Sequence, residues 1–391
     1  MDFKERILAA VNHEEPDRVP VMGLVMDQAT VNQILGRKPQ DFTKWLRKPL
    51  VGRALKPLMN TEWFWNRTYY GNWRGAVEGA IELGFDANWT IYSHMQLESG
   101  AGASEGLAMH DVWGRGWELA PDGRGNATAN YTRGLLEDEA GWERWVEEKA
   151  GLFERVIEGA RSFHRRLVDV YGDRILPIGF AAPGPFENSW QPLGFVNFTR
   201  CVYEKPQFVE RVVSFHTDFY LRYLEAVMDS GVELVLCGDD LGQKTGPMMR
   251  PALIEKLYGE SYRRVADAVH RRGKKLIFHS CGQIYPFLDK FVEWGFDGII
   301  TMEPTAGMEL AKVREQVGHR LVLVGNLDVS RLLVEGTRKE VDEAVKQAIR
   351  AAAPGGGYIL SAAHSHPFVD AERLGWMVEA AHEHGSYPIR V

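Results

Sequence analysis

In the second half of the chain, short runs of apolar residues alternate with longer stretches in which apolar residues recur every three or four positions. Continuous apolar runs are typical of buried parallel strands, and the longer stretches predict amphipathic helices. From Val19 onward the pattern predicts eight strands, at residues 19–27, 85–92, 174–187, 232–240, 275–282, 296–304, 320–328 and 358–366.

The alternation predicts a fold of the α/β class. Eight strands separated by helices suit a (β/α)8 TIM barrel better than an open doubly wound sheet, and no GxGxxG turn opens the chain. Residues 93–135 differ, because they alternate weakly and are rich in Gly, Asp and Trp. We expect them to form a short β-rich insertion of antiparallel strands between the second and third barrel strands. With no linker and no internal repeat, the chain 1–391 is predicted to be a single TIM-barrel domain.

Composition narrows the class of partner. The chain is 45% hydrophobic and carries a formal net charge of −7, which disfavours nucleic acid and anionic membrane surfaces. No window approaches 18 apolar residues, and the N-terminus lacks the apolar core of a signal peptide. Three cysteines, an odd number in a long chain, indicate a reducing compartment. We therefore expect a cytoplasmic protein that binds a small molecule or another protein.

In a parallel barrel, chemistry is expected at the C-terminal ends of the strands. The predicted strands end in a set of polar and titratable residues: Asp27, Glu187, Cys237, Asp239, Asp240, His279, Cys281, Glu303, Asn326, Asp328, His364 and His366. Asp and Asn also form turns, so Asp239, Asn326 and Asp328 stay open between a turn and a site role. Cys237 and Cys201 are expected to lie in the core.

The segment "KKLIFHSCGQIYPF" (274–287) raises the sharpest question, because an apolar run ends in His279 and Cys281. If the chain is still extended there, both side chains lie on one face of the strand. With His364 at the end of the last predicted strand they form a nitrogen and sulfur set of the kind that zinc prefers. His366 alternates with His364 and is the other candidate for the third ligand. A single histidine and a buried cysteine are also ordinary core residues.

The stretch "TEWFWNRTYYGNW" (61–73) concentrates aromatic residues. Two interpretations are open: packing against the barrel or a partner subunit, and an apolar lid over a flat substrate or cofactor.

Four segments together resemble the uroporphyrinogen decarboxylase superfamily: "EPDRVPV" (15–21), the stretch from "GDDLGQ" to "HSCG" (238–282), "GNLD" (325–328) and "GGGYILSAAHSHPFVDAERLGWMVEAAHEHG" (355–385). The resemblance runs over nearly the whole chain and implies a (β/α)8 barrel with one of two activities. One branch of the superfamily is the decarboxylase itself, which uses no metal and holds substrate carboxylates through arginines in an N-terminal loop. The other branch comprises zinc-dependent methyltransferases that move a methyl group to or from a corrinoid on a partner protein, with a His-x-Cys at a strand end and a third ligand near the C-terminus.

Two departures from the family pattern guide the choice. No arginine occurs between Arg18 and Arg37, so the carboxylate clamp of the decarboxylase is missing where it should be. In addition, methyltransferases of the coenzyme M type have cysteine at the position aligned with His364. The zinc role therefore carries over directly onto His279 and Cys281, and onto His364 by substitution.

A ligand set of one cysteine and two histidines leaves more positive charge on zinc and makes it a stronger Lewis acid. We therefore predict a zinc-dependent methyltransferase that moves a methyl group from an oxygen-bound donor, such as a methoxylated aromatic, to the cobalt of a corrinoid protein. Glu187, Asp240 and Glu303 are expected to add an oxygen ligand or to protonate the leaving oxygen. Asn326 and Asp328 complete the catalytic candidates. No Asp-x-His-x-x-Gly pattern occurs, so the corrinoid is expected on a separate protein.

Three alternatives remain. A metal-free decarboxylase, of uroporphyrinogen or another carboxylate, would need cations at the barrel mouth, for which Arg18, Arg200 and Lys244 are the candidates. A non-catalytic scaffold for a corrinoid system is disfavoured by the intact His279 and Cys281. A zinc lyase or hydrolase would use Asp239 or Asp240 as its base. The sequence leaves four points open. They are the identity of the methyl donor, whether the acceptor is a corrinoid or another methyl carrier, the third zinc ligand, and the oligomeric state, for which a homodimer is one possibility.

Overall fold

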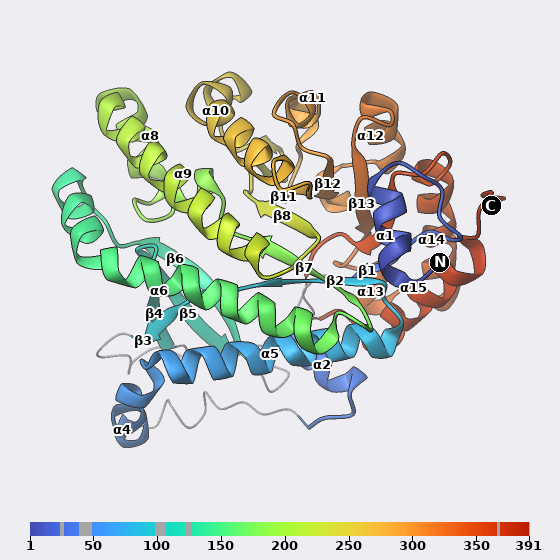
Figure 1. Ribbon diagram of the computed structural model, residues 1–391, viewed down its shortest axis with the longest axis horizontal. Coiled ribbons are helices and arrows are strands. Elements are labelled where there is room, and N and C mark those ends of the chain that lie inside the picture. Colours follow the sequence, from blue (N-terminus) through green and yellow to red (C-terminus); the bar gives the residue numbers. More distant parts are fainter. Residues whose placement is uncertain (24–26, 39–48, 98–106, 122–126, 366–367, 391) are drawn as a thin grey trace.

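The computed structural model describes residues 1–23, 27–38, 49–97, 107–121, 127–365 and 368–390 (Figure 1). Its main sheet has eight parallel strands in the order β1 (Met22–Gly23), β2 (Ala87–Ile91), β7 (Leu176–Ala181), β8 (Leu234–Gly238), β11 (Lys275–Ser280), β12 (Gly298–Thr301), β13 (Val322–Leu327) and β14 (Tyr358–Ala362). A parallel bridge between Val21 and Leu360 joins the last strand to the first. The predicted (β/α)8 TIM barrel is confirmed, and each barrel strand lies within a predicted range.

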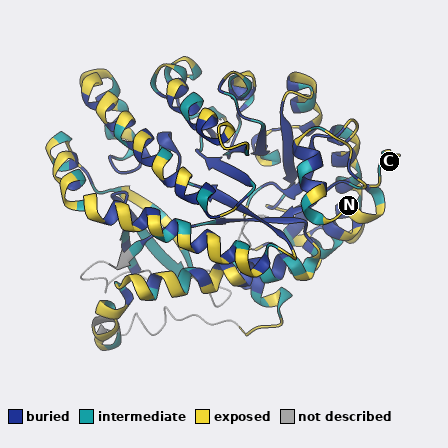
Figure 2. Cartoon of the chain, viewed as in Figure 1, coloured by how far each residue is buried: buried dark blue, intermediate teal, exposed yellow. Residues whose placement is uncertain are grey.

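Helices surround this sheet. They are α1 (Phe3–Val11), α2 (Gln28–Ile34), α4 (Pro49–Met59), α5 (Glu62–Leu83), α6 (Glu139–Tyr171), α7 (Pro185–Trp190), α8 (Phe195–Glu204), α9 (Pro206–Asp229), α10 (Pro251–His270), α11 (Leu288–Glu293), α12 (Leu310–Val317), α13 (Leu332–Glu335), α14 (Arg338–Ala352) and α15 (Ala371–His384). Two 3₁₀ helices cover Tyr285–Phe287 and Pro304–Ala306. Figure 2 shows the barrel strands almost entirely buried, while the helices expose one side to solvent.

Helix α14 illustrates why these sequences form such helices. Thr337 and Glu340 make a reciprocal capping box at its start, which satisfies backbone N–H groups that have no partner inside the helix. Its buried residues then recur at helical spacing: Val341, Val345, Ala348, Ile349 and Ala352. This stripe packs the helix onto the barrel.

The register of β11 directs His279 into the barrel. His279 pairs with Gly238 on β8 and with Ile300 on β12, and side chains of paired residues share a face of the sheet. Phe278, on the opposite face, packs outward with its ring 4.6 Å from that of Phe291. The imidazole therefore points inward near the C-terminal end of its strand.

A second sheet is inserted after β2. Its antiparallel strands run in the order β3 (Met95–Leu97), β4 (Leu107–Asp111), β5 (Arg115–Pro121) and β6 (Ala127–Gly134), which confirms the predicted β-rich insertion. The end of β6 packs tightly on the loop after α7, because a Cβ at Gly134 would lie 2.3 Å from the Pro192 carbonyl oxygen. Tyr131 on β6 donates a hydrogen bond to the Gln191 carbonyl oxygen at 2.8 Å. A small hairpin, β9 (Gly242–Gln243) and β10 (Gly246–Pro247), follows β8.

The aromatic stretch 61–73 lies in α5 and serves mainly in packing. Trp65, Tyr70 and Trp73 are buried, whereas Trp63 is 63% exposed. The packing interpretation is confirmed for the three buried rings. Cys201 and Cys237 are buried, as expected.

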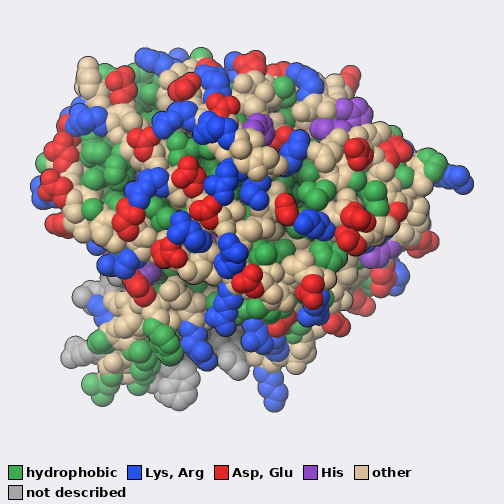
Figure 3. All heavy atoms as spheres, viewed as in Figure 1, with side chains coloured by type: hydrophobic (Ala, Val, Ile, Leu, Met, Phe, Trp, Pro, Cys, Tyr) green, Lys and Arg blue, Asp and Glu red, His purple; other side chains and the backbone are tan. Residues whose placement is uncertain are grey.

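Two further properties of the structure bear on possible partners: the distribution of charge on the surface and the hydrophobicity of the helices. On the face drawn in Figure 3, acidic and basic side chains are interspersed over the helices. None of the helices in the described parts of the chain is both long and apolar enough to cross a membrane.

The "EPDRVPV" segment lies at the N-terminal end of the barrel. Asp86, just before β2, accepts hydrogen bonds from Arg6 Nη1 at 2.6 Å, from Arg18 Nη1 at 2.8 Å and from the Val21 backbone N–H at 2.8 Å. The Asp86 side chain is almost fully buried. The interpretation of Arg18 as a cation of the mouth is wrong, because an ion pair ties it to the opposite end of the barrel.

This buried network predicts a large effect of Asp86→Ala. The substitution leaves two guanidinium groups without their buried partner, so we expect the free energy of unfolding to fall by about 3–5 kcal/mol in urea denaturation. The control is Glu379→Ala, which removes the exposed ion pair with Arg338 and should cost less than about 1 kcal/mol. Equal losses in the two variants would contradict this account of barrel closure.

Candidate functional site

Two loops leave the C-terminal end of the barrel side by side, one after β8 and one after β11. Leu241 N–H donates to Ser280 Oγ at 2.9 Å, and Gln283 N–H donates to the Gln243 carbonyl oxygen at 2.9 Å. Gly282 has a φ of +78°, and a Cβ there would lie 2.4 Å from the Gly242 carbonyl carbon. Glycine is thus required for both the left-handed conformation and the close approach of the two backbones.

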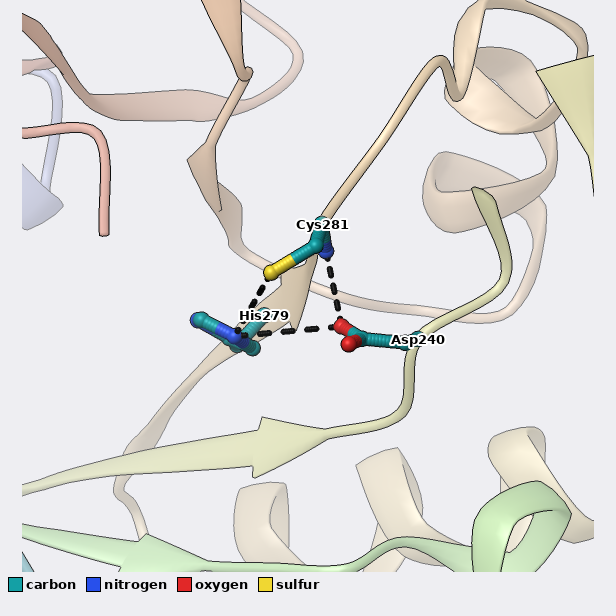
Figure 4. Close-up of side chains that lie close together, drawn as sticks. All are labelled: Asp240, His279 and Cys281. Carbon is teal, nitrogen blue, oxygen red and sulfur yellow. Dashed lines mark hydrogen bonds and ion pairs between the residues drawn. The ribbon is translucent and has the colours of Figure 1, made fainter. Parts of the chain in front are cut away.

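This contact gathers three side chains into one cluster (Figure 4). His279 Nε2 lies 3.8 Å from Cys281 Sγ and 3.9 Å from Asp240 Oδ1. Asp240 Oδ1 also accepts a hydrogen bond from the Cys281 backbone N–H at 2.8 Å. The predicted pair on one face of the strand end is therefore observed, together with Asp240 from the neighbouring loop.

The cluster fits a metal ion in both chemistry and size. The candidate ligand atoms of Asp240, His279 and Cys281 lie within 4.8 Å of one another. Tetrahedral zinc, with bonds of about 2.3 Å to sulfur and 2.0–2.1 Å to nitrogen, would hold those two atoms about 3.6 Å apart. The observed separation of 3.8 Å between sulfur and nitrogen is close to that value. Mixed nitrogen, sulfur and oxygen donors suit zinc.

Burial sets the protonation of the two strand-end residues. It lowers the pKa of His279, with the charge of Asp240 acting in the opposite direction. It also raises the pKa of the Cys281 thiol well above its usual value, and the nearby carboxylates of Asp240 and Glu303 add to that rise. At neutral pH the imidazole and thiol are then uncharged, so a metal ion that binds here must displace the thiol proton.

The His279 ring has two further neighbours. Thr301 Oγ1, at the end of β12, lies 3.1 Å from Nδ1. The Phe180 ring packs on the other side, with its centroid 5.3 Å from that of the imidazole.

His364 and Glu303 lie next to the cluster without joining it. His364 Nε2 is 3.9 Å from Glu303 Oε1, and Glu303 Oε2 accepts a hydrogen bond from the Gly282 backbone N–H at 3.1 Å. His366 lies outside the described residues. His364 as third ligand stays a prediction, and Asp240 is a second candidate for that position.

Glu187, at the start of α7, is an acid whose pKa is strongly raised. Burial raises its pKa well above the usual range, and the charges of Asp240 and Asp239 raise it further. Gln191 Nε2 donates to its Oε1 at 2.5 Å. The raised pKa favours the protonated form of this carboxyl, which can deliver a proton.

A chain of hydrogen bonds links Glu187 to the inserted sheet. Arg115 Nη1 donates to Gln191 Oε1 at 2.7 Å, and Arg115 Nε donates to Asp111 Oδ2 at 2.6 Å. Arg115 and Gln191 are both buried. Sequence reasoning missed this connection, because Arg115 and Gln191 are separated by 76 positions and neither lies in a recognisable motif.

Asp239 is used to hold α7 in place. Its carboxylate accepts hydrogen bonds from the Phe186 N–H at 2.9 Å, the Glu187 N–H at 2.8 Å and the Tyr262 hydroxyl at 2.9 Å. Burial raises its pKa to about 7, against the effect of these donors. The structure thus favours a positioning role for Asp239 over that of a free base.

Asn326 and Asp328 also make structural contacts. Asn326 Nδ2 donates to the carbonyl oxygens of Met302 at 2.8 Å and Met308 at 3.3 Å. Asp328 accepts three backbone N–H groups that follow it, the first from Ser330 at 2.8 Å. Neither belongs to the metal-like cluster, and their catalytic role stays a prediction.

The remaining predicted cations are exposed. Arg200, on α8, bonds to Asn197 Oδ1 at 2.8 Å, and Lys244 lies at the tip of the β9–β10 hairpin. Arg115, whose positive charge acts on Glu187, is already paired with Asp111.

Comparison with known proteins gives a family and a fold. Residues 129–384 match the family model described as uroporphyrinogen decarboxylase (URO-D). A uroporphyrinogen decarboxylase from Shewanella amazonensis is 27% identical over 196 residues, which are 48% of this chain and 52% of that protein. The chain thus spans about half the length of this curated relative.

Two solved structures share the architecture. A methyltransferase from Methanosarcina mazei superposes with a TM-score of 0.70 at 19% identity, covering 98% of this chain and 99% of that one. A B12-independent methionine synthase from Shewanella sp. W3-18-1 gives a TM-score of 0.50 at 10% identity, covering 93% and 96%. At these identities the likeness shows a common fold.

The contact between the two mouth loops predicts the effect of Gly282→Ala. The substitution places a methyl group against the Gly242 backbone, so the loops must separate and Asp240 must move away from Cys281. We expect a stability loss in urea unfolding larger than the penalty of about 1–2 kcal/mol for the left-handed conformation alone, and weaker zinc binding.

Gly307→Ala is the matched control. Gly307 has a φ of +79°, and no atom of the described part of the chain lies within 4 Å of a Cβ at that position. It should show the conformational penalty without the loss of zinc binding. Equal stability losses and equal zinc affinities would show that the close approach of the two loops is unimportant.

Proposed function

The chain belongs to the uroporphyrinogen decarboxylase family, and on that premise we propose that it is a zinc-dependent methyltransferase acting on an oxygen-bound methyl group. The donor is of the methoxylated aromatic class, and the acceptor is the cobalt of a corrinoid on a partner protein. The observation that carries the proposal is the cluster of Asp240, His279 and Cys281 at the barrel mouth. Metal-free decarboxylation gives no reason for a thiol and an imidazole to converge there.

In this proposal His279 and Cys281 hold the zinc, and Asp240 or His364 completes the protein ligands. Bound zinc supplies a Lewis acid that draws electron density from the ether oxygen of the donor. The loop contact around Gly282 keeps Asp240 and Cys281 together. The neutral thiol of Cys281 must lose its proton on binding, so zinc affinity rises with pH.

Glu187 is proposed as the general acid. The Co(I) of the reduced corrinoid would donate the electron pair of the new cobalt–carbon bond and become Co(III). The bond between the methyl carbon and the ether oxygen breaks at the same time, and its electron pair stays on the oxygen. That oxygen then takes the proton of Glu187, whose protonated form is favoured by burial. Gln191 Nε2 donates to one carboxyl oxygen of Glu187 and so holds the carboxyl group in place.

Aromatic rings beside His279 support a flat donor. The ring of Phe180 lies 5.3 Å from the imidazole, and the ring of Trp89 lies 4.6 Å from Phe180. Aromatic surfaces of this kind bind aromatic rings through stacked and edge-to-face contacts.

The local charge opposes a polycarboxylate substrate. The carboxylates of Asp240 and Glu303 lie beside Cys281, and the buried guanidinium of Arg115 is paired with Asp111. A metal cation is stabilised in such surroundings, whereas the carboxylates of a porphyrinogen would be repelled. The decarboxylase is nevertheless the second candidate, because the family description and the Shewanella relative carry that name.

The proposal is tested by methyl transfer to cob(I)alamin. Zinc-loaded protein, reduced cobalamin and a panel of methoxylated aromatics are mixed without oxygen, and methylcobalamin is followed by its visible spectrum. We expect transfer with wild-type protein and a loss of about 100-fold or more in Cys281→Ser. Cys201→Ser, at a buried cysteine away from the site, is the control and should keep the activity.

In a second assay, metal-free wild-type protein and metal-free Cys281→Ser are incubated with uroporphyrinogen. Release of carbon dioxide by both the wild-type protein and Cys281→Ser, with no methyl transfer from any donor, would overturn the proposal in favour of the decarboxylase.

A further inference from the structure

The end of β12 has an unusual backbone. Thr301 has a φ of +97° and Met302 a φ of +46°, and both are buried. Positive φ is rare outside glycine, and for a β-branched residue such as threonine it is a genuine outlier. Strain of this kind costs about 1–3 kcal/mol and clusters at functional sites.

The strain coincides with an unexpected side-chain direction. Ile300 pairs with the inward-facing His279, so alternation along β12 would turn Thr301 outward, together with its partner Ser280. Instead the Thr301 hydroxyl lies 3.1 Å from Nδ1 of His279. The left-handed conformation at the strand end thus accompanies a contact that a regular strand would not make.

We propose that Thr301 is the positioning residue for His279. Its hydroxyl accepts the Nδ1 hydrogen, which leaves the lone pair of Nε2 free on the side of Cys281 Sγ and Asp240 Oδ1. The inference rests on the proposed metal role of His279 and Cys281, and is independent of which methyl donor the protein uses.

The contacts around the ring explain why a hydroxyl is needed. The Phe180 ring restricts the imidazole sterically, but it cannot distinguish Nδ1 from Nε2 as the protonated nitrogen. With a metal ion on Nε2, Nδ1 carries the hydrogen, and the Thr301 hydroxyl can accept it and fix the rotation of the ring. In zinc sites such outer partners alter metal affinity by about 10- to 100-fold.

Two substitutions separate the hydroxyl from the shape of the side chain. Thr301→Val keeps the β-branched shape and removes the hydroxyl, whereas Thr301→Ser keeps the hydroxyl. The control is Thr90→Val on β2, where the hydroxyl is buried and has no hydrogen-bond partner among the described residues. Dissociation constants for Zn²⁺ and Co²⁺ are measured by competition with a chromophoric chelator, alongside the visible spectrum of bound Co²⁺ and the thermal midpoint of each metal-free variant.

We expect Thr301→Val to weaken both metals by about 10- to 100-fold and to change the Co²⁺ spectrum. Thr301→Ser and Thr90→Val should bind like the wild-type protein. A Thr301→Val variant with wild-type affinity and spectrum would overturn the positioning role alone. A wild-type protein that binds neither metal would instead overturn the zinc proposal, and this inference with it.

Discussion

The parallel register between β8 and β11 is the constraint on which the site depends. His279 pairs with Gly238, so Cys281 and Asp240, each two residues further along, leave the barrel opposite each other. Gly242 and Gly282 then let the two loops approach within van der Waals contact, and a hydrogen bond from the Cys281 N–H fixes the Asp240 carboxylate. A shift of this register by one residue would turn His279 out of the barrel and separate the three side chains.

Residues that stabilise the barrel and residues of the candidate site lie at opposite ends of it. At the N-terminal end, buried ion pairs of Asp86 with Arg6 and Arg18 hold the first two strands together. At the C-terminal end, buried acids, an uncharged thiol and a strained strand end accumulate, all of which cost stability. The well-packed barrel between them tolerates that cost, as is usual for active sites on this fold.

Much of this architecture could be predicted from the sequence. Each barrel strand lies in a predicted apolar run, because buried parallel strands need continuous apolar residues, and the inserted sheet lies where that pattern weakens. The pairing of His279 with Cys281 followed from the alternation of a strand.

The remaining features depend on contacts between distant segments, which local patterns do not encode. Arg18 belongs to a motif segment of the resemblance, yet no local feature says which end of the barrel it occupies. The link from Arg115 through Gln191 to Glu187 joins the inserted sheet to α7, and the Thr301 contact needs a backbone conformation that no propensity predicts for threonine. Asp239, Asn326 and Asp328 could serve as turn or site residues, and the hydrogen bonds of the folded chain show their structural use.

The most direct test of the central claim is the zinc content of the purified protein after mild dialysis, measured by elemental analysis for the wild type, Cys281→Ser and Cys201→Ser. The account predicts about one zinc per chain in the wild type and in Cys201→Ser, and its loss in Cys281→Ser. The absence of zinc from all three, after growth and purification with zinc present, would contradict it. So would retention of zinc in Cys281→Ser, because the cluster at the barrel mouth would then not be the metal site.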